Sequence, residues 1–441
     1  MIPQHNEAKL SPPRPLNRQD YRTLALAALG GALEFYDFII FVFFALVIGK
    51  LFFPPDMPDW LRQFQTFGIF AAGYLARPLG GIVMAHFGDK LGRKRMFTLS
   101  IVLMAVPTLL MGMLPTYASI GIAAPLALLA LRILQGAAIG GEVPGAWVFV
   151  AEHVPTRHTG YACGTLTAGL TAGILLGSLL ATLINSSFSP AQISNWAWRL
   201  PFLVGGIFGL LAMYLRQWLQ ETPVFAEMQA RKALADELPL KTVLREHKRA
   251  VILSMLLTWL LSAAIVVVIL MTPTYLQKQF GMDAATTLKA NSLATIALTA
   301  GCITAGRIID RLGSGLTFIV GSLLLGACSY HFYSSVASDG SQLYALYSLT
   351  GFSVGIVGAV PFVMVRAFPP AVRFSGLSFS YNVAYAIFGG LTPMAVSLWL
   401  KADLLAPVHY VVSLCGMGAL LGVYLLLTEA PQRTDSTSTQ R

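Results

Sequence analysis

Long apolar runs alternate with short polar segments along almost the whole chain. Each run holds about 20 residues, enough as an α-helix to cross roughly 30 Å of hydrocarbon. The runs form two sets of six, separated by one longer polar stretch. This pattern predicts membrane-spanning helices near residues 23–49, 63–86, 97–115, 123–151, 161–185, 198–219, 250–277, 286–308, 315–336, 343–367, 375–400 and 406–428.

A short charged loop occurs twice, and its two copies are separated by half the length of the chain. Asp89 lies in the loop 88–95 and Asp310 in the loop 306–313, a spacing of 221 residues (310 − 89). A second pair of similar loops, 152–160 and 366–376, supports the same duplication. We therefore expect an all-α membrane protein with twelve transmembrane helices in two pseudo-symmetric six-helix bundles that enclose a site between them.

The polar segments divide the chain into units. The central polar stretch has a helix-forming composition over 225–237, so we expect a helix there on the cytoplasmic face. The predicted units are a cytoplasmic N-terminal segment at 1–22, an N-terminal six-helix bundle at 23–219, a cytoplasmic central loop at 220–249, a C-terminal six-helix bundle at 250–428 and a cytoplasmic tail at 429–441.

Composition and charge agree with a membrane protein. Hydrophobic residues make up 56% of the chain and charged residues 11%, with a mean hydropathy of +0.67. Of the 30 Lys and Arg residues, about 22 fall on the side of the termini, so the positive-inside rule places both termini in the cytoplasm of a bacterial-type inner membrane. The net charge of +10 therefore indicates topology and attraction to membrane lipid, and we expect no nucleic-acid partner.

The remaining chemistry excludes several classes of protein. The four cysteines, Cys163, Cys302, Cys328 and Cys415, are isolated and fall within predicted spans, without metal-ligand spacing. No nucleotide-binding glycine loop or Ser-His-acid pattern is present in the sequence. We therefore expect neither an enzyme nor a metal site.

Short motifs in both halves carry a family resemblance. They lie at residues 34–38 (EFYDF), 76–81 (ARPLGG), 86–94 (HFGDKLGRK), 132–136 (RILQG), 140–142 (GGE), 198–202 (WRLPF), 221–225 (ETPVF), 381–382 (YN) and 388–393 (FGGLTP). With these motifs the chain resembles the metabolite:proton symporters of the major facilitator superfamily, over about residues 23–428.

The resemblance implies an alternating-access uptake carrier driven by the proton gradient, without a cofactor. Carriers of this type commonly work as monomers, so we expect a monomer. The chain departs from the common loop pattern at Ala85, where a glycine often stands, and at Ser314-Gly315, where many relatives have two arginines. The second copy of the loop is therefore expected to form the weaker gate.

Three acidic residues fall inside predicted spans. Glu34 and Asp37 are three positions apart, so they share a helix face near the bilayer midplane, where an ionised carboxylate costs at least about 2.5 kcal/mol. We predict that Glu34, Asp37 and Glu142 are the candidates for proton coupling. For the first two the alternative is a static ion pair with an intramembrane arginine, and for Glu142 it is a gating pair with a basic residue of a neighbouring helix.

Two arginines also fall inside spans and can reach a central cavity. Arg77 and Arg132 are permanent cations with forked donors, which suit a carboxylate substrate. We predict that at least one of them binds the anionic group of the substrate. The alternative for Arg132 is a coupling or structural role, because Arg132-x-x-Gln135-Gly136 recurs in superfamily members with unrelated substrates.

Other polar and aromatic side chains could line the same cavity. An amide in mid-span needs a partner and offers donors and an acceptor, so we favour Gln135 and Asn382, together with Tyr36 and Tyr381, as substrate-binding residues. The full set of candidates is Tyr36, Tyr74, Gln135, Trp147, Trp259, Tyr275, Asn291, Tyr381, Asn382 and Tyr385.

The repeated loops are candidate gates. In the resembling family this loop stabilises the outward-facing state, and its acid can cap a helix N-terminus or pair with a nearby base. The alternative is a solvated charge cluster. The predicted gating residues are Asp89, Gly92, Arg93 and Lys94 in the first copy and Asp310, Arg311 and Gly313 in the second.

A stripe of glycines marks the fifth span. Gly164, Gly169, Gly173 and Gly177 recur at spacings of four or five, which allows close helix packing. The alternative is a sliding surface between the halves.

These observations favour a proton-coupled importer of a small organic anion, a mono-, di- or tricarboxylate. The first alternative is a proton symporter of a zwitterionic compatible solute such as proline or betaine. A metabolite exporter and a non-transporting sensor are further alternatives. The anion is favoured over the zwitterion because the short tail lacks the long charged extension of osmosensing relatives.

Overall fold

The computed structural model describes residues 14–91, 93–140, 142–216, 239–338, 342–369 and 372–435, and the regular elements among them are all helical. The main helices of the N-terminal half are α1 (Arg18–Phe43), α2 (Ala45–Phe52), α3 (Asp59–Leu91), α4 (Arg93–Met113), α6 (Ala123–Ile139), α7 (Glu142–His153), α8 (Thr159–Ser187) and α10 (Leu200–Arg216). The short helices α5 (Tyr117–Ile120), η1 (Thr156–His158), α9 (Pro190–Asn195) and η2 (Ala197–Arg199) connect them.

The C-terminal half has a matching set of helices. It contains α12 (Pro239–Glu246), α13 (Lys248–Ala264), η3 (Ile265–Met271), α14 (Thr272–Phe280), α15 (Ala284–Leu312), α16 (Ser314–Ser338), α17 (Leu343–Val354), η4 (Gly355–Ala359), α18 (Val360–Ala367), α19 (Arg373–Ala384), η5 (Tyr385–Gly389), α20 (Gly390–Trp399) and α21 (Ala406–Asp435).

Each of the twelve predicted spans overlaps one helix or one run of consecutive helices. Within the described residues, eight helical runs have the length and hydropathy needed to cross a membrane, and two shorter apolar helices accompany them. The helix expected over 225–237 lies outside the described residues, whereas α12 occupies the end of the same polar stretch.

The first helix begins at Arg18, earlier than the apolar pattern indicated. Asn17 accepts a hydrogen bond from the Asp20 backbone N–H, and the Asp20 side chain accepts one from the Asn17 backbone N–H, each at 2.8 Å. This capping box satisfies two N–H groups that the helix end leaves without partners. Local hydrogen bonding, rather than hydrophobicity, therefore sets the start of α1.

Two of the spanning helices contain a π-helical segment. The segment η3 lies between α13 and α14, and η5 lies between α19 and α20. Such segments insert an extra residue into the helical turn and are common at functional sites. The segment η5 is adjacent to the candidate site described below.

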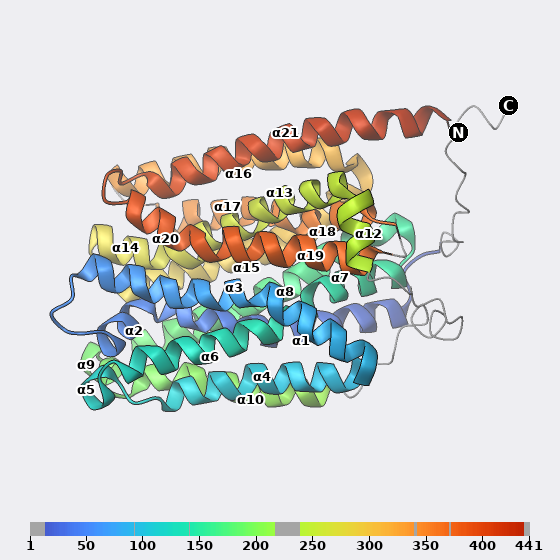
Figure 1. The fold of residues 1–441 in the computed structure, drawn as a ribbon. Helices are drawn as coiled ribbons and strands as arrows, with labels where there is room; N and C mark the ends of the chain where they lie inside the picture. Colours follow the sequence, from blue (N-terminus) through green and yellow to red (C-terminus); the bar gives the residue numbers. More distant parts are fainter. Residues whose placement is uncertain are drawn as a thin grey trace.

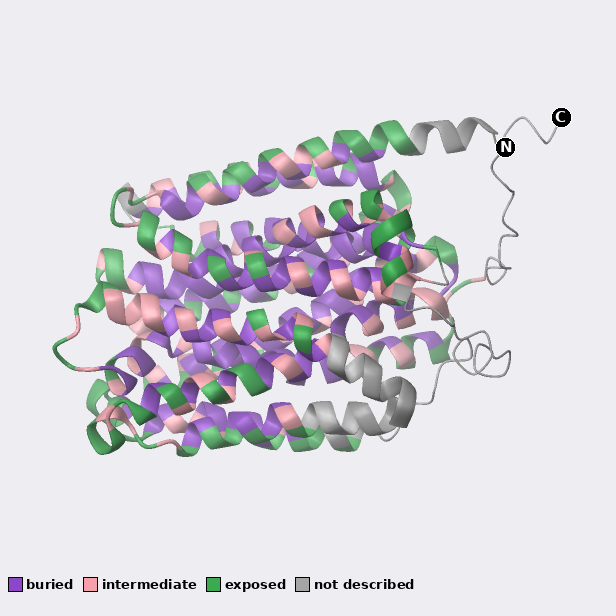
Figure 2. Ribbon diagram, in the orientation of Figure 1, coloured by how far each residue is buried: buried purple, intermediate pink, exposed green. Residues whose placement is uncertain are grey.

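The two halves lie side by side, and α8 and α15 run along each other between them (Figure 1). Helix α3 also crosses to the C-terminal half, where it contacts η5 and α20. The chain enters α1 and leaves α21 at the same end of the bundle, which we call the terminus end (Figure 1). Buried residues concentrate in the central helices, whereas α21 exposes Leu420 and Leu427 on its outer face (Figure 2).

Candidate functional site

Arg77 lies at the boundary between the halves, surrounded by tyrosine rings. It is carried by α3 and is 1% exposed. Its guanidinium carbon lies 5.3 Å from the centroid of Tyr74, 5.6 Å from that of Tyr381 and 4.9 Å from that of Tyr385. We call these three rings the aromatic cage. Because Tyr74 belongs to α3 and the other two belong to α19 and η5, both halves hold the same cation.

The guanidinium of Arg77 retains unused hydrogen-bonding capacity. Its Nε and Nη2 atoms are buried and have no hydrogen-bond partner among the described residues. The surrounding ring faces attract the cation electrostatically. Two forked donors thus remain available for an oxyanion.

The aromatic cage is itself closely packed. Tyr74 stacks on Tyr385 with centroids 5.0 Å apart, and Trp147 meets the ring of Tyr381 edge-on at 5.0 Å. Gly389, the last residue of η5, leaves no room for a side chain, because an added Cβ would lie 2.6 Å from Cδ1 of Tyr385. The π-helical segment and its glycine therefore set the position of the Tyr385 ring.

Asn382 extends the site across the boundary. Its amide donates a hydrogen bond to the carbonyl of Gly140 in the other half and another to the Ser378 carbonyl. Its Oδ1 atom is buried and has no hydrogen-bond partner among the described residues. An unused acceptor thus lies on the same helix as Tyr381.

Arg132 and Gln135 form a second cluster inside the N-terminal half. Arg132 donates from Nη1 to the Phe38 carbonyl at 3.1 Å and to Oε1 of Gln135 at 2.5 Å. Gln135 donates from Nε2 to the Asp37 carbonyl at 3.0 Å and to Oγ1 of Thr108 at 2.7 Å. Both side chains therefore hydrogen-bond to the backbone of α1. Among the described residues, neither forms a hydrogen bond or an ion pair with the aromatic cage.

The ring of Phe38 lies close to both arginines. The guanidinium carbon of Arg132 is 4.1 Å from its centroid, and that of Arg77 is 5.9 Å away. Phe38 thus links the second cluster to the aromatic cage by packing. The Nε and Nη2 atoms of Arg132 have no hydrogen-bond partner among the described residues.

The carboxyl group of Asp37 points toward α10. An added Cβ at Gly205 would lie 2.6 Å from its Oδ1 atom, and one at Gly209 would lie 3.5 Å from Oδ2. The residue is 2% exposed, and its Oδ1 atom has no hydrogen-bond partner among the described residues. Among the described side chains Asp37 forms no ion pair with Arg77 or Arg132, and the alternative of a static pair stays open for Glu34, whose side chain is not described.

The remaining candidate residues on α1 and α7 differ in what the structure describes of them. Tyr36 donates its hydroxyl to the Pro201 carbonyl at 2.8 Å, within the N-terminal half. The side chains of Glu34 and Glu142 lie outside the described part of the structure. Of the six predicted substrate-binding residues, Arg77, Tyr381 and Asn382 thus lie at the boundary, whereas Tyr36, Arg132 and Gln135 bond within one half.

At the terminus end, polar contacts join the halves. The Asp310 carboxylate accepts hydrogen bonds from the backbone N–H of Gly160 at 2.7 Å and of Tyr161 at 2.8 Å. Asp310 is thus at the N-terminus of α8, one of the two arrangements expected for the loop acids. Glu152 and Arg373 add an ion pair of 2.9 Å between the two similar loops.

The other predicted gating residues contribute less to the described contacts. Gly313 ends α15 with φ of 81°, a left-handed conformation that favours glycine, and Arg311 is exposed. The side chains of Asp89, Arg93 and Lys94 and the whole of Gly92 lie outside the described residues. Their gating role remains a prediction.

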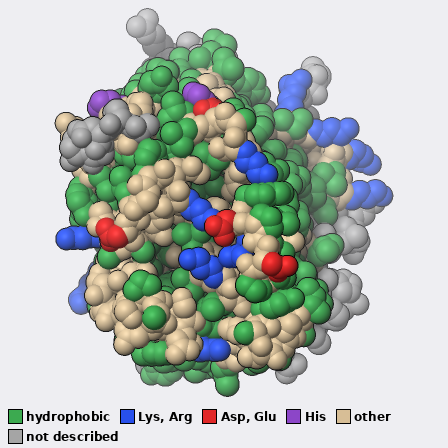
Figure 3. All heavy atoms as spheres, turned by 90° about the vertical axis from the view of Figure 1, so that its left-hand side faces the viewer, with side chains coloured by type: hydrophobic (Ala, Val, Ile, Leu, Met, Phe, Trp, Pro, Cys, Tyr) green, Lys and Arg blue, Asp and Glu red, His purple; other side chains and the backbone are tan. Residues whose placement is uncertain are grey.

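At the opposite end the halves meet through hydroxyl groups and a cation–π contact. Ser178 lies 2.9 Å from Ser292, and Asn291 donates to the Ser178 hydroxyl at 3.1 Å. The Lys401 ammonium lies 3.1 Å from the ring centroid of Trp60. Charged side chains gather near the middle of this face (Figure 3). Polar contacts therefore join the halves at both ends in this conformation.

The glycine stripe of α8 serves two different contacts. Gly164 packs on α15, where an added Cβ would lie 2.6 Å from the Cys302 carbonyl. Gly169, Gly173 and Gly177 pack instead on α1. Packing within one half thus accounts for most of the stripe, and Gly164 alone of the four faces the other half.

Sequence reasoning did not identify several of these contacts. Glu152 and Arg373 were visible only as members of similar loops, although their opposite charges were a usable signal. Ser178 and Ser292 carried no signal, because isolated serines are ordinary in apolar spans. Phe38 was part of a recognised motif, but its place close to both arginines depends on the packing of α1 on α3 and α6.

Comparisons with known proteins agree on the family. The family model described as Major Facilitator Superfamily matches residues 27–393. A proline/betaine transporter of Salmonella typhimurium is 30% identical over 419 residues, which cover 91% of this chain and 82% of that protein. A glycine betaine/proline/ectoine/pipecolic acid transporter of Dickeya dadantii is 29% identical over 421 residues, covering 92% of this chain and 83% of the relative.

A solved structure matches at the level of the fold. The proton:xylose symporter bound to 6-bromo-6-deoxy-D-glucose superimposes with a TM-score of 0.73 at 17% identity, covering 92% of this chain and 95% of its own. At this identity the likeness shows the fold alone.

Proposed function

The chain belongs to the major facilitator superfamily, a family of transporters, and we propose that it imports a small zwitterionic carboxylate of the proline or betaine type together with protons. The sequence favoured an organic anion without a positive charge. The names of the relatives support the zwitterion instead, which was the first alternative. Orientation of both termini to the cytoplasm and function as a monomer belong to the same proposal.

The observation that carries the substrate class is the combination of Arg77 with the aromatic cage. A zwitterion of this type needs a cation for its carboxylate and an electron-rich surface for its ammonium group. Arg77 offers two unused donors, and Tyr74, Tyr381 and Tyr385 offer ring faces that already hold a positive charge. A substrate without a cation would use only half of this arrangement.

We propose an exchange of cations within the cage. The substrate carboxylate draws the Arg77 guanidinium away from the rings, and the substrate ammonium takes its place on the vacated faces. Each charge then keeps a partner throughout, which limits the cost of bringing ions into a low-dielectric site. Because the rings come from both halves, a cation can contact all three rings only when the two halves are close together.

Asp37 is our candidate for the proton-carrying group. An ionised carboxylate is costly in mid-membrane without a partner, and protonation removes that cost. The nearby Arg132 keeps Nε and Nη2 unused, so a movement of α1 or α6 that brings them to Asp37 would favour release of the proton. Glu34 and Glu142 stay as alternatives from the sequence.

Alternating access would use the contacts at the two ends. Asp310 with the start of α8 and Glu152 with Arg373 hold the terminus end closed, and Ser178 with Ser292 holds the opposite end. A two-state equilibrium of a few kcal/mol responds to contacts of this size. Release of one set while the other persists would open the cage to one side at a time.

Uptake into proteoliposomes tests the proposal. The labelled panel contains glycine betaine, proline, succinate, citrate and 2-oxoglutarate, each with and without an imposed inward proton gradient. We expect accumulation of a zwitterion that collapses with a protonophore. Accumulation of only a di- or tricarboxylate would contradict the substrate class, and accumulation that ignores the gradient would contradict proton coupling.

A further inference from the structure

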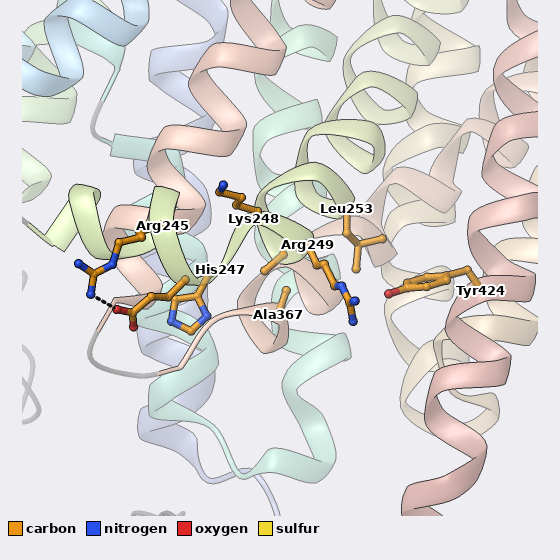
Figure 4. A pocket seen from close by; sticks show the side chains of 9 residues that line it. Arg245, His247, Lys248, Arg249, Leu253, Ala367 and Tyr424 are labelled. Atoms are coloured by element: carbon orange, nitrogen blue, oxygen red, sulfur yellow. Dashed lines mark hydrogen bonds and ion pairs between the residues drawn. The ribbon is translucent and has the colours of Figure 1, made fainter. Parts of the chain in front are cut away.

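A basic pocket opens on the terminus end of the C-terminal half, away from the aromatic cage. Its volume is about 590 Å³, within the roughly 300–1,000 Å³ of small-molecule sites. It lies where α12 passes into α13, close to the end of α18 and to α21 (Figure 4). We propose that this pocket binds the phosphate of an anionic phospholipid headgroup.

The charges of the pocket are not balanced. Among its lining residues, Arg245 pairs with Glu246 at 2.8 Å, which accounts for the one carboxylate present. Lys248 and Arg249 are exposed and have no ion pair within the described part of the chain. Two cations are therefore left without a counter-ion. In Figure 4 the Arg249 side chain points toward Tyr424, and the Lys248 side chain points away from it.

These two cations stand at an unfavourable place for helix stability. They occupy the first two positions of α13, where the helix dipole repels positive charge. The N-cap residue His247 provides no side-chain hydrogen bond, and no acidic residue lies in the first turn. An anion in the pocket would pair with Arg249 and with the N–H groups of the uncapped helix end, and the exposed Lys248 side chain would turn toward it.

The apolar part of the pocket favours a lipid over free phosphate. Leu253 and Ala367 form part of its wall, together with the ring of Tyr424, which is 47% exposed. The neighbouring outer face of α21 continues with Leu420 and Leu427, which are 72% and 69% exposed. Acyl chains can follow this apolar face while the phosphate stays at the helix end, and tyrosine suits that interfacial position.

The inference does not depend on the proposed substrate, because no residue of the pocket belongs to the aromatic cage. The test uses the full-length protein purified in detergent with an equal mixture of phosphatidylglycerol and phosphatidylethanolamine. Native mass spectrometry then measures which lipid stays bound. We expect phosphatidylglycerol to be enriched on the unchanged protein. In the variant with both Lys248→Gln and Arg249→Gln, the enrichment should fall about fivefold for each charge removed.

The matched control is the variant with Lys241→Gln and Arg157→Gln, which removes two exposed charges from the same end. It should keep the enrichment of the unchanged protein. The variant with Lys248→Gln and Arg249→Gln should fold, since loss of cations from a helix N-terminus relieves repulsion. The single change Arg249→Gln provides a second, milder variant.

A second arm distinguishes the source of the phosphate. The melting temperature is measured without lipid, in sodium phosphate and in sodium chloride of equal ionic strength. Stabilisation by phosphate without any enrichment of phosphatidylglycerol would overturn the lipid assignment in favour of a free-anion site. Equal enrichment in the unchanged protein and in the variant with Lys248→Gln and Arg249→Gln would overturn the site itself.

Discussion

The ring of Tyr74, in the N-terminal half, stacks on the ring of Tyr385, in the C-terminal half, with centroids 5.0 Å apart and planes 22° apart. Both rings lie within 5.3 Å of the Arg77 guanidinium carbon. A cation held between the two halves is thus also a contact that closes the site. In the proposed function, a substrate that replaces the cation would change the energy of closing and so couple binding to movement.

The change Arg77→Lys should weaken binding of a labelled zwitterion about 10- to 150-fold. Lysine keeps the charge but loses the forked donors, and hydrogen bonds to charged groups are worth about 1.5–3 kcal/mol. Equilibrium binding to the detergent-solubilised protein measures the effect. Unchanged affinity in Arg77→Lys would remove Arg77 from the site.

The change Tyr385→Ala should weaken binding of glycine betaine about 2- to 30-fold, because it removes one cation–π partner worth about 0.5–2 kcal/mol. Tyr385→Phe keeps the ring and is the matched control. We expect it to bind like the unchanged protein, since the proposed role uses the ring face alone. Equal losses in both variants would show that the hydroxyl, and not the ring, carries the effect.

The change Asp37→Asn should abolish accumulation driven by the proton gradient while exchange of labelled for unlabelled substrate persists. An asparagine fills the same space beside Gly205 but cannot take up or release a proton. The control is Asp403→Asn, at the opposite end. The hydrogen bond from His409 holds the pKa of the Asp403 carboxyl below its usual range, so this group stays ionised near neutral pH. Gradient-driven accumulation by Asp37→Asn would assign the proton to another acid.

The change Glu152→Gln should raise the population of the state that is open at the terminus end. The ion pair with Arg373 is partly buried, with side-chain exposures of 23% and 17%, so we expect a shift of up to about fivefold. Spin labels at positions 157 and 311, both exposed, report the distance between the halves in a variant without native cysteines.

The charge-swapped variant with Glu152→Arg and Arg373→Glu provides the control for that prediction. It should restore the distance distribution of the unchanged protein, because the attraction is reversed in direction but kept. An identical distribution in Glu152→Gln and the unchanged protein would show that this pair does not bias the gate.

The helices were largely predictable because the membrane imposes a length and a composition on each span. Each of the twelve spans predicted from hydropathy overlaps a helix of the described residues, but hydropathy missed the start of α1, where Asn17 and Asp20 act by local hydrogen bonding. That capping pattern is visible in the sequence and could have corrected the boundary. The arginines were also predictable as candidates, because a charged side chain in the middle of a membrane span is energetically costly and usually has a functional role.

The arrangement of the site was less predictable because it depends on contacts between distant helices. Tyr385 lies beside Arg77 because it belongs to the π-helical turn η5, and the residue pattern of that span did not predict such a turn. The separation of Arg132 from Arg77 likewise follows from helix packing and not from their positions in the sequence. Asp310 was predictable as a helix cap, but its partner helix in the other half was not.

The proposed pairing of a carboxylate with Arg77 and of an ammonium with the aromatic cage is tested most directly by two ligands of the same shape. Glycine betaine and 3,3-dimethylbutanoate share a carboxylate and a tert-butyl-like end, but only betaine carries the positive charge. Competition binding to the unchanged protein, to Tyr385→Ala and to Tyr385→Phe measures both affinities. We predict that betaine binds about 2- to 30-fold more tightly, and that Tyr385→Ala reduces this preference while Tyr385→Phe keeps it. Equal affinity of the two ligands for the unchanged protein would contradict the account and restore a simple anion site.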